Sequence, residues 1–263
     1  MKFGNIFGKT YNDYKKNFKA IFLFSLFFIA LPLTINTIIT SSLILKDPYF
    51  YGSYIFEKNV DLDISKIPLH FSSAIFLTAL ISFVFYFMFE AGLIKESITG
   101  KLNFNRLVNS GKSNFWKFVW FCIVSFFFLI LLFLALIIPG IIFSVYWILA
   151  VFVYFDSKKN VIESLKTSFH MVKGNWWKIF GYILLLLIFS IIIGVVTSVI
   201  SLPTLIKIYS LNSPASSLLI CDFILNSISD FLSNLIIIPF SILFYKNIYL
   251  ELKNKKNKRW QFS

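Results

Sequence analysis

Long apolar runs, separated by short polar segments, make up most of the chain. A run of roughly 18 or more apolar residues is long enough to cross a hydrocarbon core of about 30 Å. In lipid such runs form helices, because a helix pairs its own backbone N–H and C=O groups where water is absent. The pattern predicts an all-α polytopic membrane protein, with residues 1–263 forming a single integral membrane domain. Its six transmembrane helices cover residues 20–44, 70–94, 115–138, 141–156, 177–202 and 217–250.

The fourth run is shorter than the others. Pro139-Gly140 is a turn signal that should break the helix after Ile138, and Asp156 ends the run soon afterwards. Fifteen helical residues cover about 22 Å, which is less than the thickness of the hydrocarbon core. The third and fourth runs therefore form either a full hairpin or a re-entrant one. We expect the full hairpin.

Three similar segments lead into the apolar runs: "KKNFKAIFLF" at 15–24, "KSNFWKFVWF" at 112–121 and "KGNWWKIFGY" at 173–182. Each has an Asn that can cap the following helix, and then aromatic residues and a Lys. Such side chains suit the membrane boundary, where the ring or the aliphatic stem is buried and the polar end is solvated. The predicted membrane-interface anchors are Asn114, Trp116, Lys117, Asn175, Trp176, Trp177 and Lys178.

Apolar residues recur at helical spacing ahead of these segments. Val161, Leu165, Phe169 and Val172 are spaced by four, four and three residues, which predicts an amphipathic helix on the cytoplasmic surface. Asn160 and Glu163 resemble a capping box, and Gly174 suits a helix end that needs a positive φ. The N-terminal arm repeats this spacing and residues 104–111 do so more poorly, which suggests a threefold repeat of one interfacial helix plus two spans. Chance similarity in a chain rich in Phe, Asn and Lys is the alternative.

The composition is typical of a membrane protein, and the distribution of its basic residues predicts its orientation. The chain is 58% hydrophobic, 20% aromatic and 14% charged, with a formal net charge of +13. On the six-span topology, the 25 Lys and Arg residues all flank one side except Lys46, Lys58, Lys66 and Lys207. By the positive-inside rule both termini lie in the cytoplasm. We expect a multi-pass protein of the cytoplasmic (plasma) membrane whose partners are membrane lipids and not nucleic acid.

Three stretches carry a family resemblance: "LIIPGIIFSVYWILAVFVYFDSKKN", "NVIESLKTSFHMVKGNWWKIFGYILLLL" and "DFLSNLIIIPFSILFYKNIYLELK". They resemble the membrane-embedded family that includes the YciC-type bacterial inner-membrane proteins. The family also includes the membrane domain attached to some glycerophosphoryl diester phosphodiesterases. The resemblance covers roughly residues 90–255 and implies a polytopic membrane domain without an established biochemical role. It supplies no catalytic residues, and the soluble phosphodiesterase barrel has no counterpart in this sequence.

The sequence offers little catalytic chemistry. Histidine occurs only at positions 70 and 170 and cysteine only at 122 and 221, and the cysteines are expected at opposite membrane depths. His70 follows Asp61 and Asp63, but an interfacial histidine is a better explanation than a metal site. The common nucleotide, hydrolase and zinc-protease motifs are absent. We therefore expect no enzyme activity, no catalytic residue, no metal and no cofactor.

The last run contains a polar stripe. Asp222, Asn226, Ser229 and Ser233 follow one another at spacings of four, three and four, and Asp230 lies beside them. These five residues form either an outward vestibule or a packing surface, and their distance from the bilayer midplane favours packing. The leading hypothesis is a non-catalytic membrane organiser or accessory subunit. The alternative is a small permease with an outward vestibule.

Overall fold

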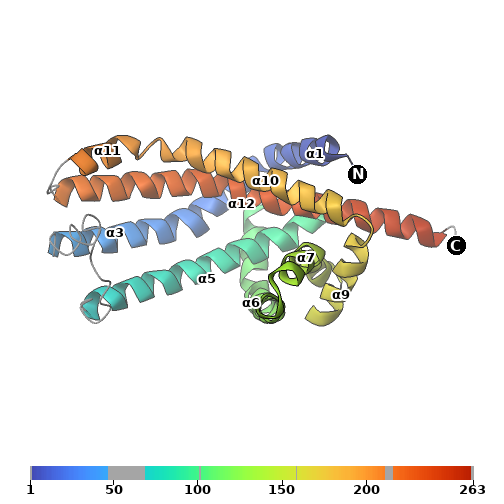
Figure 1. The fold of residues 1–263 in the computed structure, drawn as a ribbon. Helices are drawn as coiled ribbons and strands as arrows, with labels where there is room; N and C mark the ends of the chain where they lie inside the picture. The colour runs from blue at the N-terminus through green and yellow to red at the C-terminus, as the bar shows by residue number, and fades with distance from the viewer. Residues whose placement is uncertain (1, 47–68, 101, 158, 211–215, 262–263) are drawn as a thin grey trace. The chain divides into compact units, whose positions relative to one another are not determined.

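The computed structural model describes residues 2–46, 69–100, 102–157, 159–210 and 216–261. These residues are almost entirely helical and contain no strand, which confirms the all-α prediction (Figure 1). The helices are α1 (Phe3–Lys16), α2 (Phe18–Ser25), the π-helical turn η1 (Leu26–Ala30), α3 (Leu31–Lys46), α5 (Leu69–Thr99), α6 (Phe104–Ala135), α7 (Ile137–Trp147), α8 (Ala150–Asp156), α9 (Val161–Val172), α10 (Trp176–Ser198), α11 (Leu202–Ser210) and α12 (Ser216–Gln261).

Six helical segments among the described residues are long and apolar enough to cross a membrane, as the sequence predicts. The third begins 11 residues before the predicted span and ends four residues before its end, and the second and sixth each end five residues later than predicted, because polar residues continue the same helices. The segments are Phe18–Lys46, Ser72–Thr99, Phe104–Leu134, Ile137–Asp156, Trp176–Ser198 and Ser216–Lys255.

The chain divides into two compact units, and each is described by itself. The first unit comprises Met1–Phe24, Phe87–Ser190 and Ile237–Ser263. The second comprises Ser25–Tyr86 and Ile191–Ile236. The first unit therefore contains α1, α6, α7, α8 and α9 whole, together with parts of the longer helices.

Aromatic side chains join α1 to α10 and α12 in the first unit. The ring centroids of Phe7 and Phe240 are 5.2 Å apart, and those of Phe7 and Phe189 are 6.1 Å apart. Phe3 lies 5.9 Å from Phe244, which is fully buried. These contacts use the predicted apolar positions Phe3 and Phe7, so the apolar face of α1 packs against protein.

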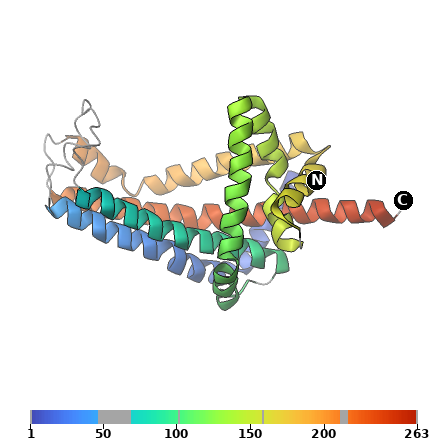
Figure 2. The same cartoon turned by 90° about the horizontal axis from the view of Figure 1, so that it is seen from below.

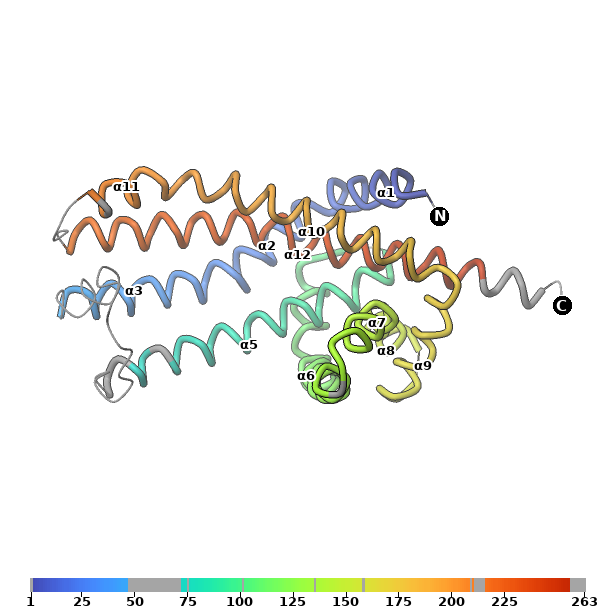
Figure 3. Tube along the Cα trace, viewed as in Figure 1, coloured from blue at the N-terminus to red at the C-terminus, as the bar shows by residue number. Residues whose placement is uncertain are grey.

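Helices α6 and α7 lie side by side, and both run crosswise to the part of α12 that follows residue 237. Figure 1 views α6 nearly along its axis while that part of α12 lies in the page, and in the view of Figure 2 α6 is upright and crosses in front of the same part of α12. Helix α9 then packs on α6 and α8 through a buried cluster of Phe121, Ala150, Val161 and Leu165. The tube in Figure 3 follows the chain from α7 through α8 into α9.

The turn between α6 and α7 differs from the predicted one. The break falls at Leu136, which has extended backbone (φ −163°, ψ 138°), and α7 begins at Ile137. Pro139 therefore lies in the first turn of α7, where a helix tolerates proline because the first N–H groups have no intrahelical partner. The prediction that the helix breaks after Ile138 is wrong by two residues.

The first span contains a π-helical turn that the sequence analysis did not predict. Residues Leu26–Ala30 are π-helical, and Pro32 follows directly. In a regular α-helix the ring of Pro32 would clash with the carbonyl of Phe28. We infer that the wider π turn accommodates the proline, as such single turns commonly do within longer helices.

The second unit has its own apolar contacts. Ile44, Ile208 and Leu219 form a buried cluster that joins α3, α11 and α12. The hydroxyl groups of Thr37 and Ser227 are 2.7 Å apart. The Tyr86 hydroxyl donates to Asn234 Oδ1 at 3.3 Å, so polar contacts also tie α12 to α3 and α5.

Candidate functional site

A buried polar junction joins α1 to α12 in the first unit. Lys246 Nζ lies 2.6 Å from Asp13 Oδ2. Asn247 Nδ2 donates to the same Asp13 oxygen at 3.2 Å and to Thr10 Oγ1 at 3.1 Å. Only 4% of Lys246 and 2% of Asn247 are exposed. Helix α12 can bury a lysine here because α1 supplies a carboxylate at hydrogen-bond distance.

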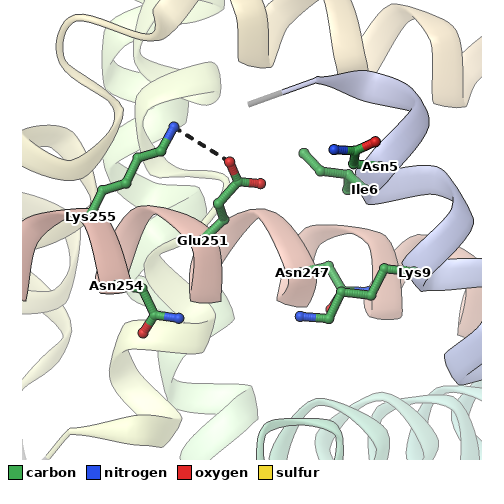
Figure 4. A pocket seen from close by; sticks show the side chains of 7 residues that line it. All are labelled: Asn5, Ile6, Lys9, Asn247, Glu251, Asn254 and Lys255. Carbon is green, nitrogen blue, oxygen red and sulfur yellow. Dashed lines mark ion pairs between the residues drawn. The ribbon is translucent and has the colours of Figure 1, made fainter.

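A polar pocket of about 330 Å³ adjoins this junction. Asn247 lines the pocket and links it to the junction, and Figure 4 shows that the other side chains also come from α1 and α12. Glu251 Oε1 and Lys255 Nζ form an ion pair of 3.4 Å within α12. The pocket is lined by Asn5, Ile6, Lys9, Asn247, Glu251, Asn254 and Lys255.

A second polar junction joins α8 to α12. The Tyr249 hydroxyl donates to Asp156 Oδ2 at 2.5 Å, and Lys253 forms an ion pair with the same carboxylate. Lys95 donates from α5 to the carbonyl of Phe155 at 2.8 Å. Asp156, which sequence analysis placed at a span end, therefore holds α8 and α12 together.

A third polar contact lies between α5 and α6. Ser110 Oγ donates to Glu96 Oε1, and Glu96 is only 8% exposed. Together the three contacts place a carboxylate at each of three helix-to-helix connections in the first unit. In this unit the carboxylates of Asp13, Glu96 and Asp156 are all paired, an arrangement that rigidifies packed helices.

The predicted interface anchors separate into two groups. The Trp116 and Trp177 side chains are 77% and 78% exposed, so both rings are available to the surroundings. Trp176 instead donates from Nε1 to the carbonyl of Ile142 at 3.2 Å and stacks on Phe180 at 5.0 Å. Trp176 is therefore used to pack α10 on α7. Lys117 and Lys178 are exposed.

Only some of the Asn residues that were expected to cap a helix do so. Asn160 caps α9, because its Oδ1 accepts from Glu163 N at 2.8 Å, and Gly174 has the expected positive φ of 86°. Asn114 instead lies inside the continuous α6, where its Nδ2 donates to the carbonyl of Ser110 at 2.9 Å. The helix break expected in the middle segment is thus absent, since α6 runs unbroken from Phe104 to Ala135.

The first and third segments also differ from the expected arrangement. Asn17 Nδ2 donates to the carbonyl of Asp13 at 2.8 Å, and its Oδ1 accepts from Leu102 N at 3.3 Å. Asn17 therefore ends α1 and ties it to the segment before α6, instead of capping α2. Asn175 contributes its backbone carbonyl, which accepts from Ile179 N at 3.0 Å.

The predicted stripe lies on α12 in the second unit. Asp222 accepts from Thr204 Oγ1 at 2.6 Å and from Asn226 Nδ2 at 2.9 Å, so it connects α11 to α12. Ser229 is buried and Ser233 is half-buried, whereas Asp230 is exposed. Asp222 therefore contacts α11, whereas the contact of Asn226 with Asp222 lies within α12.

The histidines and cysteines form no cluster in the described part of the chain, where groups of three or more His, Cys, Asp or Glu suited to a metal are absent. His170 is exposed on α9. Asp61 and Asp63 lie outside the described residues, as does the side chain of His70. Cys122 and Cys221 are free thiols in different units.

Sequence analysis missed the junction of Asp13, Lys246 and Asn247. The signal was present, because Lys246 and Asn247 interrupt an otherwise apolar stretch of the last run. The Asp13 partner of Lys246 lies 233 residues away, and nothing in the spacing of either helix indicates that pairing.

No protein-family model, no curated protein and no solved structure gives a significant match to the chain. The resemblance to the YciC-type proteins therefore stays an expectation from sequence.

Proposed function

We propose that this protein is a multi-pass protein of the cytoplasmic membrane, with both termini in the cytoplasm, that acts without catalysis as a membrane organiser or accessory subunit. The observation that carries the proposal is that three carboxylates of the first unit bond neighbouring helices. Asp13, Glu96 and Asp156 each bond a neighbouring helix in the first unit. Groups held in this way stabilise a scaffold and are not free for proton transfer or substrate binding.

The exposed surface supports the same proposal. The tip of the α6–α7 hairpin is apolar and exposed: Leu134 is 78% exposed, Ile137 68% and Ile138 70%. Soluble monomers rarely expose contiguous apolar surface of this kind, so lipid is the natural partner. Trp116 and Trp177 would then lie at the headgroup level.

The permease alternative has one observation in its favour. Asp230 is an exposed carboxylate within a helix long enough to cross a membrane, and ionisable groups inside membranes are usually functional. Asp222, the other acidic member of the stripe, already accepts two hydrogen bonds.

The two functions differ in their response to Asp230→Asn. Proteoliposomes of the wild type and of Asp230→Asn would be tested for uptake of a panel of radiolabelled ions and small metabolites. For an organiser we expect no uptake above empty vesicles with either protein. The matched control is Ser233→Ala on the same stripe. Uptake by the wild type that Asp230→Asn abolishes and Ser233→Ala retains would replace the organiser with the permease.

An organiser should also hold lipid selectively. Native-lipid particles of the wild type would be extracted, and their lipids compared with the bulk membrane by mass spectrometry. We expect anionic lipids to be enriched, because the chain has a formal charge of +13. A lipid profile identical to the bulk membrane would count against the proposal.

Single cysteines would establish the orientation. In a Cys122→Ser/Cys221→Ser background, Lys2→Cys and Lys255→Cys report the two chain ends and Lys207→Cys reports the opposite face. A membrane-impermeant maleimide added outside intact cells should label only Lys207→Cys. Labelling of one chain end but not the other before lysis would overturn the topology.

A further inference from the structure

An apolar groove lies between α9 and the hairpin of α6 and α7, three helices that belong whole to the first unit. Its volume is about 310 Å³. Leu165 in its lining is 5% exposed, whereas Ile162 is 49% exposed, so the groove reaches from the interior of the unit to its surface. Its apolar lining consists of Phe128, Phe143, Trp147, Ile162, Leu165 and Phe169. An apolar groove that opens at the surface is typical of a ligand-binding site.

Ring contacts hold the walls of the groove in place. The ring centroids of Phe143 and Trp147 on α7 are 5.3 Å apart, and Trp147 lies 6.5 Å from Phe128 of α6. Phe143 also stacks on Phe169 of α9, with the two centroids 6.0 Å apart. The walls therefore come from all three helices and are formed before any ligand arrives, as in most small-molecule sites.

The polar edge of the groove is basic. Lys166 and His170 complete the lining, lie four residues apart on one face of α9 and are both exposed. Among the described residues, Lys166 has no hydrogen-bond or ion-pair partner. The one acid of α9, Glu163, does not line the groove, and its Oε1 accepts from Asn160 Nδ2 at 3.2 Å. The groove therefore joins an apolar interior to a cation without a counterion, which suits an amphiphile with an anionic head.

We infer that this groove binds one acyl chain of an anionic phospholipid, with the lipid phosphate at Lys166 and His170; the inference rests on the proposed membrane placement. An acyl chain carries no polar group, whereas a peptide would bring its backbone N–H and C=O groups into a mostly apolar lining. Ligand sites usually measure about 300–1,000 Å³, and a groove at the lower end of that range takes one chain while the second stays in the bilayer. A choline headgroup would place its own cation near Lys166, so the basic edge favours a lipid with net negative charge.

Photo-crosslinking tests this inference. Wild-type protein in phosphatidylcholine vesicles would receive a trace of phosphatidylglycerol or phosphatidylcholine that carries a diazirine on one acyl chain, and the cross-linked residues would be mapped by mass spectrometry. We expect the phosphatidylglycerol probe to label Phe143 and Trp147 at least about fivefold more than the phosphatidylcholine probe does. Leu187 and Ile188 of α10, each 50% exposed, are the internal reference for ordinary bilayer contact, and both probes should label them equally.

Matched variants locate the site in the groove. Lys166→Gln removes the cation from an exposed position and should make the two probes label the groove equally. Lys173→Gln removes an exposed cation directly after α9 that does not line the groove, and it should keep the preference. Ile162→Trp fills the open edge of the groove and should reduce its labelling, whereas Ile141→Trp, at an exposed position of α7 outside the lining, should not. Equal loss of the preference in both lysine variants would reduce the effect to general charge and overturn the inference.

The reference residues on α10 separate failure of this inference from failure of the proposed function. Labelling of the groove that equals labelling of α10 with both probes would mean ordinary bilayer contact and would overturn the lipid site. Labelling of α10 without labelling of the groove, together with a dimer in native mass spectrometry, would assign the groove to a second copy of the chain and also overturn it. In both cases the membrane placement stands. Absence of labelling at α10 as well as at the groove would overturn the membrane placement itself.

Discussion

Gly92 of α5 lies directly against Gly111 of α6. A Cβ placed on Gly92 would be 3.1 Å from Gly111 N and 2.5 Å from the carbonyl oxygen of Leu107. A Cβ on Gly111 would lie 2.5 Å from the carbonyl oxygen of Met88. Both short distances are to backbone atoms, which cannot move aside as a flexible side chain can. Glycine at these positions lets the two helix backbones meet, as small residues commonly do between membrane helices.

Alanine at either position should therefore force α5 and α6 apart. We expect Gly92→Ala and Gly111→Ala each to cost about 1–3 kcal/mol of stability, the usual range for overpacking, with values at the upper end. Thermal unfolding of the purified protein in detergent measures the loss.

Gly181→Ala on α10 is the matched control, because nothing lies within 4 Å of a Cβ added there. Alanine has the higher helix propensity, so the control should be neutral or more stable by up to about 1 kcal/mol. If all three variants unfold at the same temperature, the close contact of α5 and α6 does not form.

The pair of Asp13 and Lys246 allows a second test. Lys246→Met leaves the Asp13 carboxylate without its cation beside a buried amide. Removing one partner of a buried ion pair costs about 3–5 kcal/mol; we expect less here, because the Asp13 side chain is 29% exposed. The unfolding transition of Lys246→Met in detergent should shift to clearly lower temperature.

The double variant Asp13→Asn/Lys246→Met completes the cycle. Asparagine keeps an oxygen that can accept from Asn247, and no unpaired charge remains. The double variant should recover much of the stability that Lys246→Met loses. If the stability losses of the single variants Lys246→Met and Asp13→Asn simply add in the double variant, the two residues do not interact in the folded protein.

The sequence predicts the helices, but it does not predict which side chains join them. Apolar length alone predicts six spans, and the motif around Asn160 and Gly174 predicts both ends of α9. The prediction at Asn114 is wrong because the local signal "GKSN" looks like a helix end. Gly111 there serves a contact with Met88 of α5. Whether a glycine ends a helix or lets two helices touch depends on which other residues lie beside it in the fold. A single sequence does not show which residues come together.

The same reasoning explains the candidate pocket. Lys9, Asn247 and Lys255 look like ordinary basic and polar residues at the ends of apolar runs. They become a pocket only because the aromatic contacts of Phe3 and Phe7 lay α1 along α12. The stripe on α12 was easier to predict, since all five of its members lie on one helix and their spacing shows that four share a face.

Asp156 leads to a third prediction. Its carboxylate accepts from the Tyr249 hydroxyl at 2.5 Å and pairs with Lys253. Tyr249→Phe removes one hydrogen bond to a charged group and should cost about 1.5–3 kcal/mol. Asp156→Asn also removes the ion pair and should cost more. Tyr154→Phe is the control on α8, because its ring centroid lies 5.3 Å from that of Phe121 and the ring is kept. Its loss of stability on thermal unfolding should be smaller than that of Tyr249→Phe.

The crosswise course of α6 and α7 leads to the last prediction. The two helices and the part of α12 after residue 237 cannot all run along the membrane normal (Figure 2). The hairpin contains no charged residue between Lys117 and Asp156, and its exposed tip needs an apolar environment. A hairpin that enters the hydrocarbon obliquely and returns to the same side would meet both requirements, so we predict the re-entrant form, which is the alternative to the full hairpin expected from the sequence. In a background lacking the native cysteines, Ile138→Cys carrying a fluorophore should be quenched by lipids with a quencher on the acyl chain. It should not react with an impermeant maleimide from outside, whereas Lys207→Cys should. Reaction of Ile138→Cys from outside would mean that the hairpin crosses the membrane completely.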